Sequence, residues 1–184
     1  SSRRKPILLR GARQVGKSTL VHNFAKSHNL ILNEINLERR KDLASTFATL
    51  NPSIICERLS AILGRDIKAA NSILFIDEIQ AVPEAIASLR YFYEEMPELP
   101  VLAAGSLLEF ALAKHSFSMP VGRIEYLHLG PMDFREFAEE VNPYLASCLD
   151  MEIIKSPKGA LIHDEMMKLL RTYLFVGGMP ECVL

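Results

Sequence analysis

The stretch GARQVGKST, residues 11–19, constrains the fold of this chain more than any other. It matches the pattern G-x-x-x-x-G-K-[ST], a loop that wraps phosphate groups between a β-strand and an α-helix. An apolar run at residues 7–9 precedes the loop, and Leu20, Val21 and Phe24 mark one face of a helix after it. The motif therefore stands at a strand-to-helix turn, whereas the alternative is a glycine turn that lysine happens to follow.

Each residue type in this loop has a chemical reason to be there. Gly11 and Gly16 let the backbone turn tightly and approach phosphate without a Cβ atom in the way. The N–H groups of residues 13–18 then converge on an anion, and the helix N-terminus adds its partial positive charge. Lys17 is expected to reach the β- and γ-phosphates, and Ser18 to bind Mg²⁺. The predicted nucleotide-binding residues here are Gly11, Ala12, Arg13, Gln14, Val15, Gly16, Lys17, Ser18 and Thr19.

A second motif, ILFIDE at residues 73–78, consists of four apolar residues that end in two acids. A buried parallel strand can deliver a carboxylate to the C-terminal edge of a sheet, beside the phosphate loop. Asp77 is expected to bind Mg²⁺ together with Ser18, and Glu78 to orient the water that attacks the γ-phosphate. Alternatively, the acids only cap the strand and start a helix. Because they follow a phosphate loop, they predict one shared site.

Ser106 ends the next predicted strand, where its hydroxyl can contact the γ-phosphate, or alternatively cap a helix that starts at residue 107. An arginine from a neighbouring subunit or domain often completes such a site by neutralising charge in the transition state. We favour Arg123 over Arg135 for this role, and we expect Arg90 to be an exposed helix position. The predicted catalytic residues are Lys17, Glu78, Ser106 and Arg123.

Strands and helices alternate in the first part of the chain, which predicts an α/β fold with a parallel sheet and right-handed crossovers. We expect strands at residues 6–10, 30–37, 72–76, 101–104 and 123–129, the last at an edge of the sheet. Helices are expected after the phosphate loop and at residues 39–50, 52–64, 83–96, 107–115 and 131–141. No pattern typical of a β-strand occurs from residue 142 onward. We therefore predict an α/β core over residues 1–141 and an all-α segment over residues 142–184.

Composition narrows the classes of function. A net charge of −1 gives no general attraction to nucleic acid or to acidic membranes. The most apolar stretch, residues 99–113, is interrupted by Pro100, Gly105 and Glu109 and is too short to cross a bilayer. The three cysteines form no C-x-x-C pair, and their plain interpretation is reduced thiols in a cytoplasmic protein. The chain lacks an initiator methionine, so we expect a fragment of a longer protein.

Six segments occur in an order that is typical of one family. They are GARQVGKST at 11–19, LFIDEIQ at 74–80, AGS at 104–106, GR at 122–123, GPMDFREF at 130–137 and GGMPE at 177–181. Together they resemble the prokaryotic AAA+-type predicted ATPases, in which a C-terminal domain with a nuclease-like fold follows the ATPase domain.

This resemblance implies a five-stranded P-loop NTPase sheet in the order 5-1-4-3-2, ATP with Mg²⁺ as ligands, and hydrolysis to ADP and phosphate. It also implies that residues 142–184 form a helical lid and that the C-terminal domain is missing here. A glycine-proline segment lies near the adenine in related ATPases, which implies this position for Gly178 and Pro180. The family pattern has a sensor arginine before these glycines, and only Arg171 stands there.

We interpret the chain as an ATPase that couples turnover to movement of a lid and of an attached or partner domain. Its expected partners are ATP or ADP, the missing domain and other subunits. Two alternatives stay open, a nucleotide-dependent binding switch with little turnover and a small-molecule kinase. Glu78 favours the hydrolase over the switch, because binding alone does not need it. The acid pair and Ser106 fit activation of water better than phosphorylation of a substrate.

Overall fold

The computed structural model describes residues 4–106, 122–150 and 157–183. The chain divides into two units, of which the first ends at Leu129 and the second begins at Gly130. This division falls earlier than the boundary near Asn142 that the sequence analysis predicted. Helix α6 (Phe134–Val141) belongs to the second unit because it packs against α7 (Pro143–Ser147) and α8 (Pro157–Val176).

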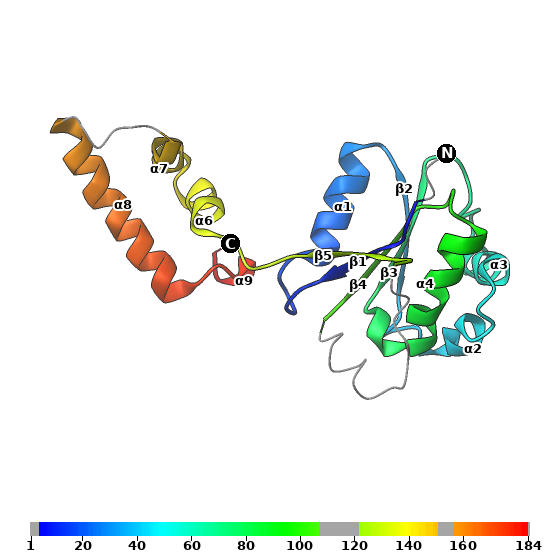
Figure 1. The fold of residues 1–184 in the computed structure, drawn as a ribbon. Coiled ribbons are helices and arrows are strands. Elements are labelled where there is room, and N and C mark those ends of the chain that lie inside the picture. The colour runs from blue at the N-terminus through cyan, green and yellow to red at the C-terminus, as the bar shows by residue number, and fades with distance from the viewer. Residues whose placement is uncertain (1–3, 107–121, 151–156, 184) are drawn as a thin grey trace. The chain divides into compact units, whose positions relative to one another are not determined.

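The first unit is built on a five-stranded sheet whose strands all run parallel (Figure 1). The strands are β1 (Ile7–Arg10), β2 (Ile31–Asn36), β3 (Ser72–Asp77), β4 (Val101–Gly105) and β5 (Glu125–His128). Their order, β2-β3-β4-β1-β5, is the predicted order 5-1-4-3-2 read from the other edge. The predicted α/β fold and the predicted edge position of β5 are therefore confirmed. Strands β1, β3 and β4 end at the same edge of the sheet.

The helices of the first unit cover the two faces of the sheet unequally (Figure 1). Helix α1 (Lys17–Ser27) lies on one face, whereas α2 (Ala44–Phe47), α3 (Pro52–Leu63) and α4 (Pro83–Glu95) lie on the other. Right-handed crossovers explain this, since the chain crosses the sheet in one direction from β1 to β2 and returns strand by strand to β4. The larger core lies under the three helices, and the smaller cluster under α1 contains Leu9, Val21, Phe75 and Ala104.

Residues 39–50 do not form the single helix that the sequence predicted. They form a 3₁₀ turn, η1 (Lys41–Leu43), and then the short helix α2. The Thr49 hydroxyl donates a hydrogen bond to the Thr46 carbonyl at 2.7 Å, and Leu50 adopts a left-handed φ of 53°. A side chain that competes for a backbone carbonyl and a left-handed residue both end a helix, which explains the shorter element.

The second unit is helical in its described part, with α6, α7, η3 (Cys148–Asp150), α8 and α9 (Pro180–Val183). Helix α6 begins at Phe134 rather than near Pro131, because Asp133 and Glu136 form a capping box. The Tyr173 hydroxyl donates a hydrogen bond to the Met132 carbonyl at 2.9 Å. The predicted helix at residues 107–115 lies outside the described residues. No helix of the described chain combines the length and the apolar character needed to cross a membrane.

Gly178 offers a test of packing in the second unit. A Cβ atom there would lie 2.0 Å from the carbonyl oxygen of Met132, whose N–H donates to the Gly178 carbonyl at 2.7 Å. We expect Gly178→Ala to lower the free energy of unfolding by about 1–3 kcal/mol, because the backbone of Met132 must move. Gly130→Ala is the matched control, since a Cβ there meets nothing within 4 Å. Urea unfolding followed by circular dichroism measures both, and equal midpoints would contradict the expected clash.

Candidate functional site

The loop between β1 and α1 forms a turn at the C-terminal edge of the sheet. Two of its residues have left-handed backbone conformations, Gln14 with φ 64° and Gly16 with φ 97°. Helix α1 starts at Lys17 and has neither a side-chain cap nor an acidic residue in its first turn. Its first N–H groups therefore point out of the helix without a capping side chain, which is the arrangement that binds an anion.

Lys17 lies inside this loop. It is 7% exposed, and its Nζ atom donates hydrogen bonds to the carbonyl oxygens of Gly11 at 3.0 Å and Ala12 at 2.6 Å. Burial lowers the pKa of Lys17, and the nearby carboxylates of Glu78 and Asp77 oppose this shift. A partly desolvated amine beside exposed backbone N–H groups fits the charge and hydrogen-bonding needs of a phosphate group.

A hydrogen bond joins the start of α1 to the end of β3. The Ser18 hydroxyl donates to Oδ2 of Asp77 at 3.0 Å, and Oδ1 of Asp77 accepts the N–H of Glu78 at 2.9 Å. Burial raises the pKa of Asp77, which is 8% exposed, although both hydrogen bonds oppose this shift. Mg²⁺ prefers oxygen ligands of this kind and takes few of them from a protein. The paired oxygens of Ser18 and Asp77 therefore fit the predicted metal site.

Glu78 and Ser106 also meet at this edge of the sheet. Ser106 is 6% exposed, and its hydroxyl donates to Oε2 of Glu78 at 3.4 Å. Gln80 completes the group, because its Nε2 donates to the same Glu78 oxygen and lies 3.5 Å from Oγ of Ser106. Gln80 is not among the site residues that the sequence predicts. The signal for it was its place in the LFIDEIQ segment, two residues after Glu78.

The other predicted loop residues have different environments. Val15 is buried, whereas Arg13, Gln14 and Thr19 are exposed. A Cβ atom on Gly11 would lie 2.2 Å from the backbone oxygen of the residue that follows β5. Gly11 is therefore required by close packing of the backbone, which the phosphate-loop pattern alone does not indicate.

Arg123 lies where the parallel strands begin, whereas Lys17 lies where they end. It precedes β5, and the first residue of β5 pairs with Ile7, the first residue of β1. Its Nη1 donates to Oε1 of Glu94 at 3.1 Å, and Arg90, which is exposed as expected, bonds the same oxygen at 3.0 Å. The fold therefore does not bring Arg123 to the phosphate loop of its own chain. Its role in the site of a neighbouring subunit stays a prediction.

Gly178 and Pro180 belong to the second unit. Gly178 is buried against Met132, and Pro180 is the first residue of α9. Arg171, the only arginine of the expected lid ahead of these glycines, is exposed on α8. The predicted contacts of these residues with a nucleotide stay predictions.

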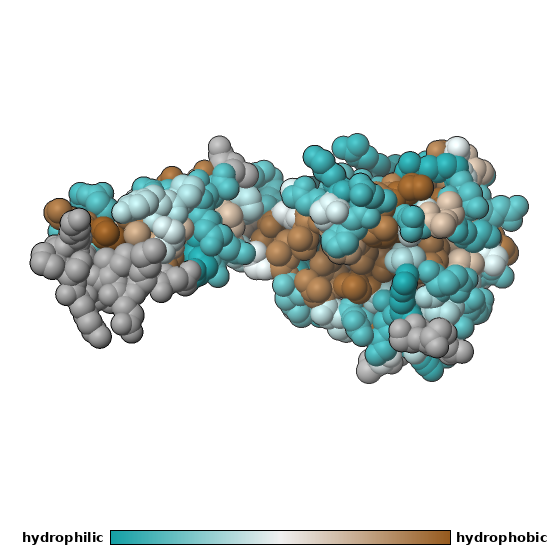
Figure 2. Space-filling view, turned by 90° about the horizontal axis from the view of Figure 1, so that it is seen from above, coloured by the Kyte–Doolittle hydropathy of each residue, from teal (hydrophilic) through white to brown (hydrophobic). Residues whose placement is uncertain are grey.

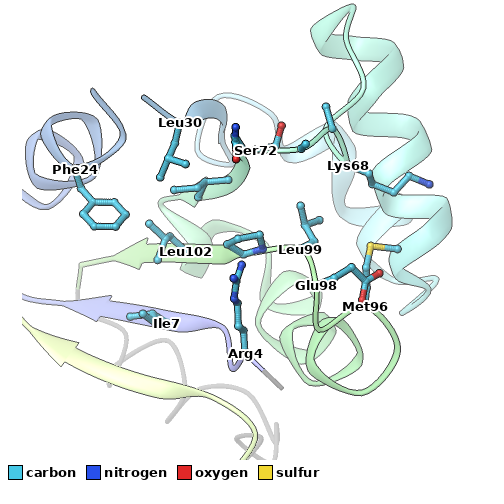
Figure 3. A pocket seen from close by; sticks show the side chains of 15 residues that line it. Arg4, Ile7, Phe24, Leu30, Lys68, Ser72, Met96, Glu98, Leu99 and Leu102 are labelled. Atoms are coloured by element: carbon cyan, nitrogen blue, oxygen red, sulfur yellow. The ribbon is translucent and has the colours of Figure 1, made fainter. Parts of the chain in front are cut away.

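A cavity of about 730 Å³ opens at the edge of the sheet opposite the phosphate loop (Figure 3). Ile7, Phe24, Leu30 and Leu102 line it with apolar side chains, and it lies where β1, β3 and β4 begin. Figure 2 shows that apolar side chains also gather on the surface of the first unit. None of the predicted site residues lines the cavity, so it is separate from the candidate site.

Asp77 gives a prediction with a defined pH dependence. Burial raises the pKa of Asp77 above the usual value of 3.8, so its ionised form opposes folding once the pH exceeds the raised pKa. Below the usual value the carboxyl is protonated in both states and no penalty remains. Asp77→Asn should therefore raise the melting temperature of the ligand-free protein at neutral pH, by about 2–4 °C for each kcal/mol relieved. The gain should shrink as the pH falls between the two pKa values.

Scanning calorimetry over a pH series measures this difference between Asp77→Asn and the wild type. Asp164→Asn, on an exposed position of α8, is the matched control and should not show the same gain. If Asp77→Asn melts at a lower temperature than the wild type at neutral pH, the hydrogen bonds of Asp77 outweigh the cost of its burial, and the prediction is wrong.

Comparison with known proteins agrees with this geometry. The family model described as an AAA domain matches residues 3–138, which includes the phosphate loop, the acid pair and Ser106. A search of curated proteins finds no match to the chain. The matched residues span well over half of the sequence and contain the whole parallel sheet. The chain therefore belongs to the AAA domain family of P-loop, nucleotide-binding ATPases.

Proposed function

We propose that this chain binds ATP with Mg²⁺ and hydrolyses it to ADP and phosphate. One observation carries the proposal. The Ser18–Asp77 hydrogen bond joins the phosphate loop to the acid pair, so that Lys17, Glu78 and Ser106 share one edge of the sheet. Membership of the AAA domain family supports nucleotide binding, and the position of Glu78 supports hydrolysis.

The phosphate loop supplies the binding energy in this proposal. Lys17 and the first N–H groups of α1 hold the β- and γ-phosphates, and the phosphate oxygens replace the Gly11 and Ala12 carbonyls as acceptors for Lys17. Ser18 and Asp77 would hold the Mg²⁺, which would supply positive charge to offset that of the phosphate groups. The exposed residues of the loop contribute through their backbone N–H groups rather than through their side chains.

Glu78 activates the water in this proposal. Its carboxylate accepts a hydrogen bond from the water and takes its proton as the water oxygen bonds to the γ-phosphorus. The bond from that phosphorus to the bridging oxygen breaks, and ADP leaves with the electron pair. Ser106 lies next to Glu78 and donates a hydrogen bond to a γ-phosphate oxygen, so that it detects whether this phosphate is present.

We also propose that turnover moves the second unit as a lid and acts on an attached domain or a partner. The support is a direct contact between the phosphate loop and the end of the first unit. Leu129 donates its N–H to the Arg10 carbonyl at 2.8 Å, and a Cβ on Gly11 would collide with the Leu129 carbonyl. A change in the loop therefore reaches the residue that connects the two units.

Phosphate release and ATP binding, measured on the same variants, test the hydrolase. We expect Glu78→Gln to bind ATP like the wild type but to release phosphate about 100-fold more slowly or worse, since the general base is lost. Lys17→Ala should lose binding itself. Glu57→Gln, on an exposed position of α3, is the matched control and should behave like the wild type.

The alternatives predict other outcomes in the same assay. A binding switch would show wild-type affinity for ATP without phosphate release, and a kinase would need an acceptor molecule before it consumed ATP. Equal rates of phosphate release from Glu78→Gln and the wild type would show that Glu78 is not the catalytic base.

A further inference from the structure

We infer that Gln80 is a positioning residue, which holds one oxygen of Glu78 so that the other faces the attacking water. The inference rests on the proposed function, because it assigns a task to a neighbour of the proposed catalytic base. It starts from three contacts in the described structure. Gln80 Nε2 donates to Oε2 of Glu78, Ser106 Oγ donates to the same oxygen at 3.4 Å, and Gln80 Nε2 lies 3.5 Å from Ser106 Oγ.

The backbone after β3 is shaped so that Gln80 turns back towards Glu78. Glu78 has a left-handed conformation, with φ 49° and ψ 46°, which is costly for a residue with a Cβ atom. The 3₁₀ turn η2 (Ile79–Ala81) follows at once, and the N–H of Ala81 donates to the Glu78 carbonyl at 2.9 Å. The turn brings the two side chains together.

The Gln80 amide is oriented so that its Nε2 donates to Glu78, while its own oxygen is left without a donor from the described residues. Its Oε1 atom is buried and has no hydrogen-bond partner among the described residues. The opposite orientation of the amide would place Oε1 against the Glu78 carboxylate, so the carboxylate determines which way the amide points. A buried acceptor without a partner weakens folding. A purely structural role does not explain this arrangement, whereas a donor aimed at a catalytic carboxylate does.

The hydroxyl of Ser106 shows why Glu78 needs a second donor. A serine hydroxyl has one proton, which Ser106 donates to Oε2 of Glu78 in this structure. When Ser106 donates that proton to a γ-phosphate oxygen, it no longer donates to Glu78. Gln80 is then the described side chain that still holds Oε2. It keeps Glu78 in place at the stage when the water must be activated.

Steady-state kinetics of Gln80→Leu test this role. The substitution keeps approximate side-chain volume and removes both polar atoms of the amide. We expect kcat to fall about tenfold or more, the effect of one hydrogen bond to a charged group. KM and the affinity for an ATP analogue should stay within about twofold, because Gln80 orients the base and does not bind nucleotide. The melting temperature should not fall, since Gln80→Leu also removes the buried unpartnered oxygen.

A double-mutant cycle separates positioning from a general loss of structure. In the Glu78→Gln background, Gln80→Leu should have little further effect on kcat, because there is no carboxylate left to orient. Gln80→Met provides a second, more flexible substitution of similar length, should Gln80→Leu fail to fold. The inference is overturned if both variants turn over ATP at the wild-type rate or faster, or if Gln80→Leu slows Glu78→Gln as much as it slows the wild type.

The controls distinguish a failure of this inference from a failure of the proposed function. If Glu78→Gln retains wild-type turnover, the proposed hydrolytic role of Glu78 fails and the inference fails with it. If Glu78→Gln loses turnover but the Gln80 variants keep it, the hydrolase stands and only the positioning role is wrong.

Discussion

The site depends on one partly buried hydrogen bond, from the Ser18 hydroxyl to Oδ2 of Asp77. It joins the start of α1, the helix that follows β1, to the end of β3. Strands β1 and β3 are not neighbours, because β4 lies between them. Because β1, β4 and β3 run parallel, the loop after β1 and the acids after β3 lie at the same edge of the sheet. All six residues of β3 are buried, so the strand that carries Asp77 is fixed in position by the core around it.

Several groups around this bond lower the stability of the folded protein. Lys17 and Asp77 are both buried. Burial lowers the pKa of Lys17 and raises the pKa of Asp77, so it disfavours the charged form of each side chain. Glu78 has a left-handed backbone, and a buried oxygen of Gln80 has no partner among the described residues. Conflicts of this kind concentrate at functional sites, where stability is given up for geometry. These features gather around Asp77 in space and mark the site independently of the sequence motifs.

The fold and the centre of the site could be predicted from the sequence because strong local patterns encode them. The phosphate loop needs two glycines and a lysine at fixed spacing, and the buried strand before Asp77 is a continuous apolar run. The strand order came from the resemblance to AAA+ ATPases rather than from the residues themselves. Gln80 was missed because its contact depends on the left-handed turn at Glu78, and no residue pattern predicts that turn. Helix α6 starts later than the sequence predicts, because Asp133 and Glu136 form the capping box that fixes its first turn.

We propose that the phosphate loop and the acid pair form one site for ATP with Mg²⁺. Thermal unfolding of the wild type, with ATP and Mg²⁺ together and with ATP and a chelator, tests it most directly. We expect ATP with Mg²⁺ to raise the melting temperature, by the equivalent of about 2.7 kcal/mol when the ligand exceeds its Kd about 100-fold. We also expect a smaller shift when the metal is removed. If millimolar ATP with Mg²⁺ causes no shift, the phosphate loop and the acid pair do not form this site.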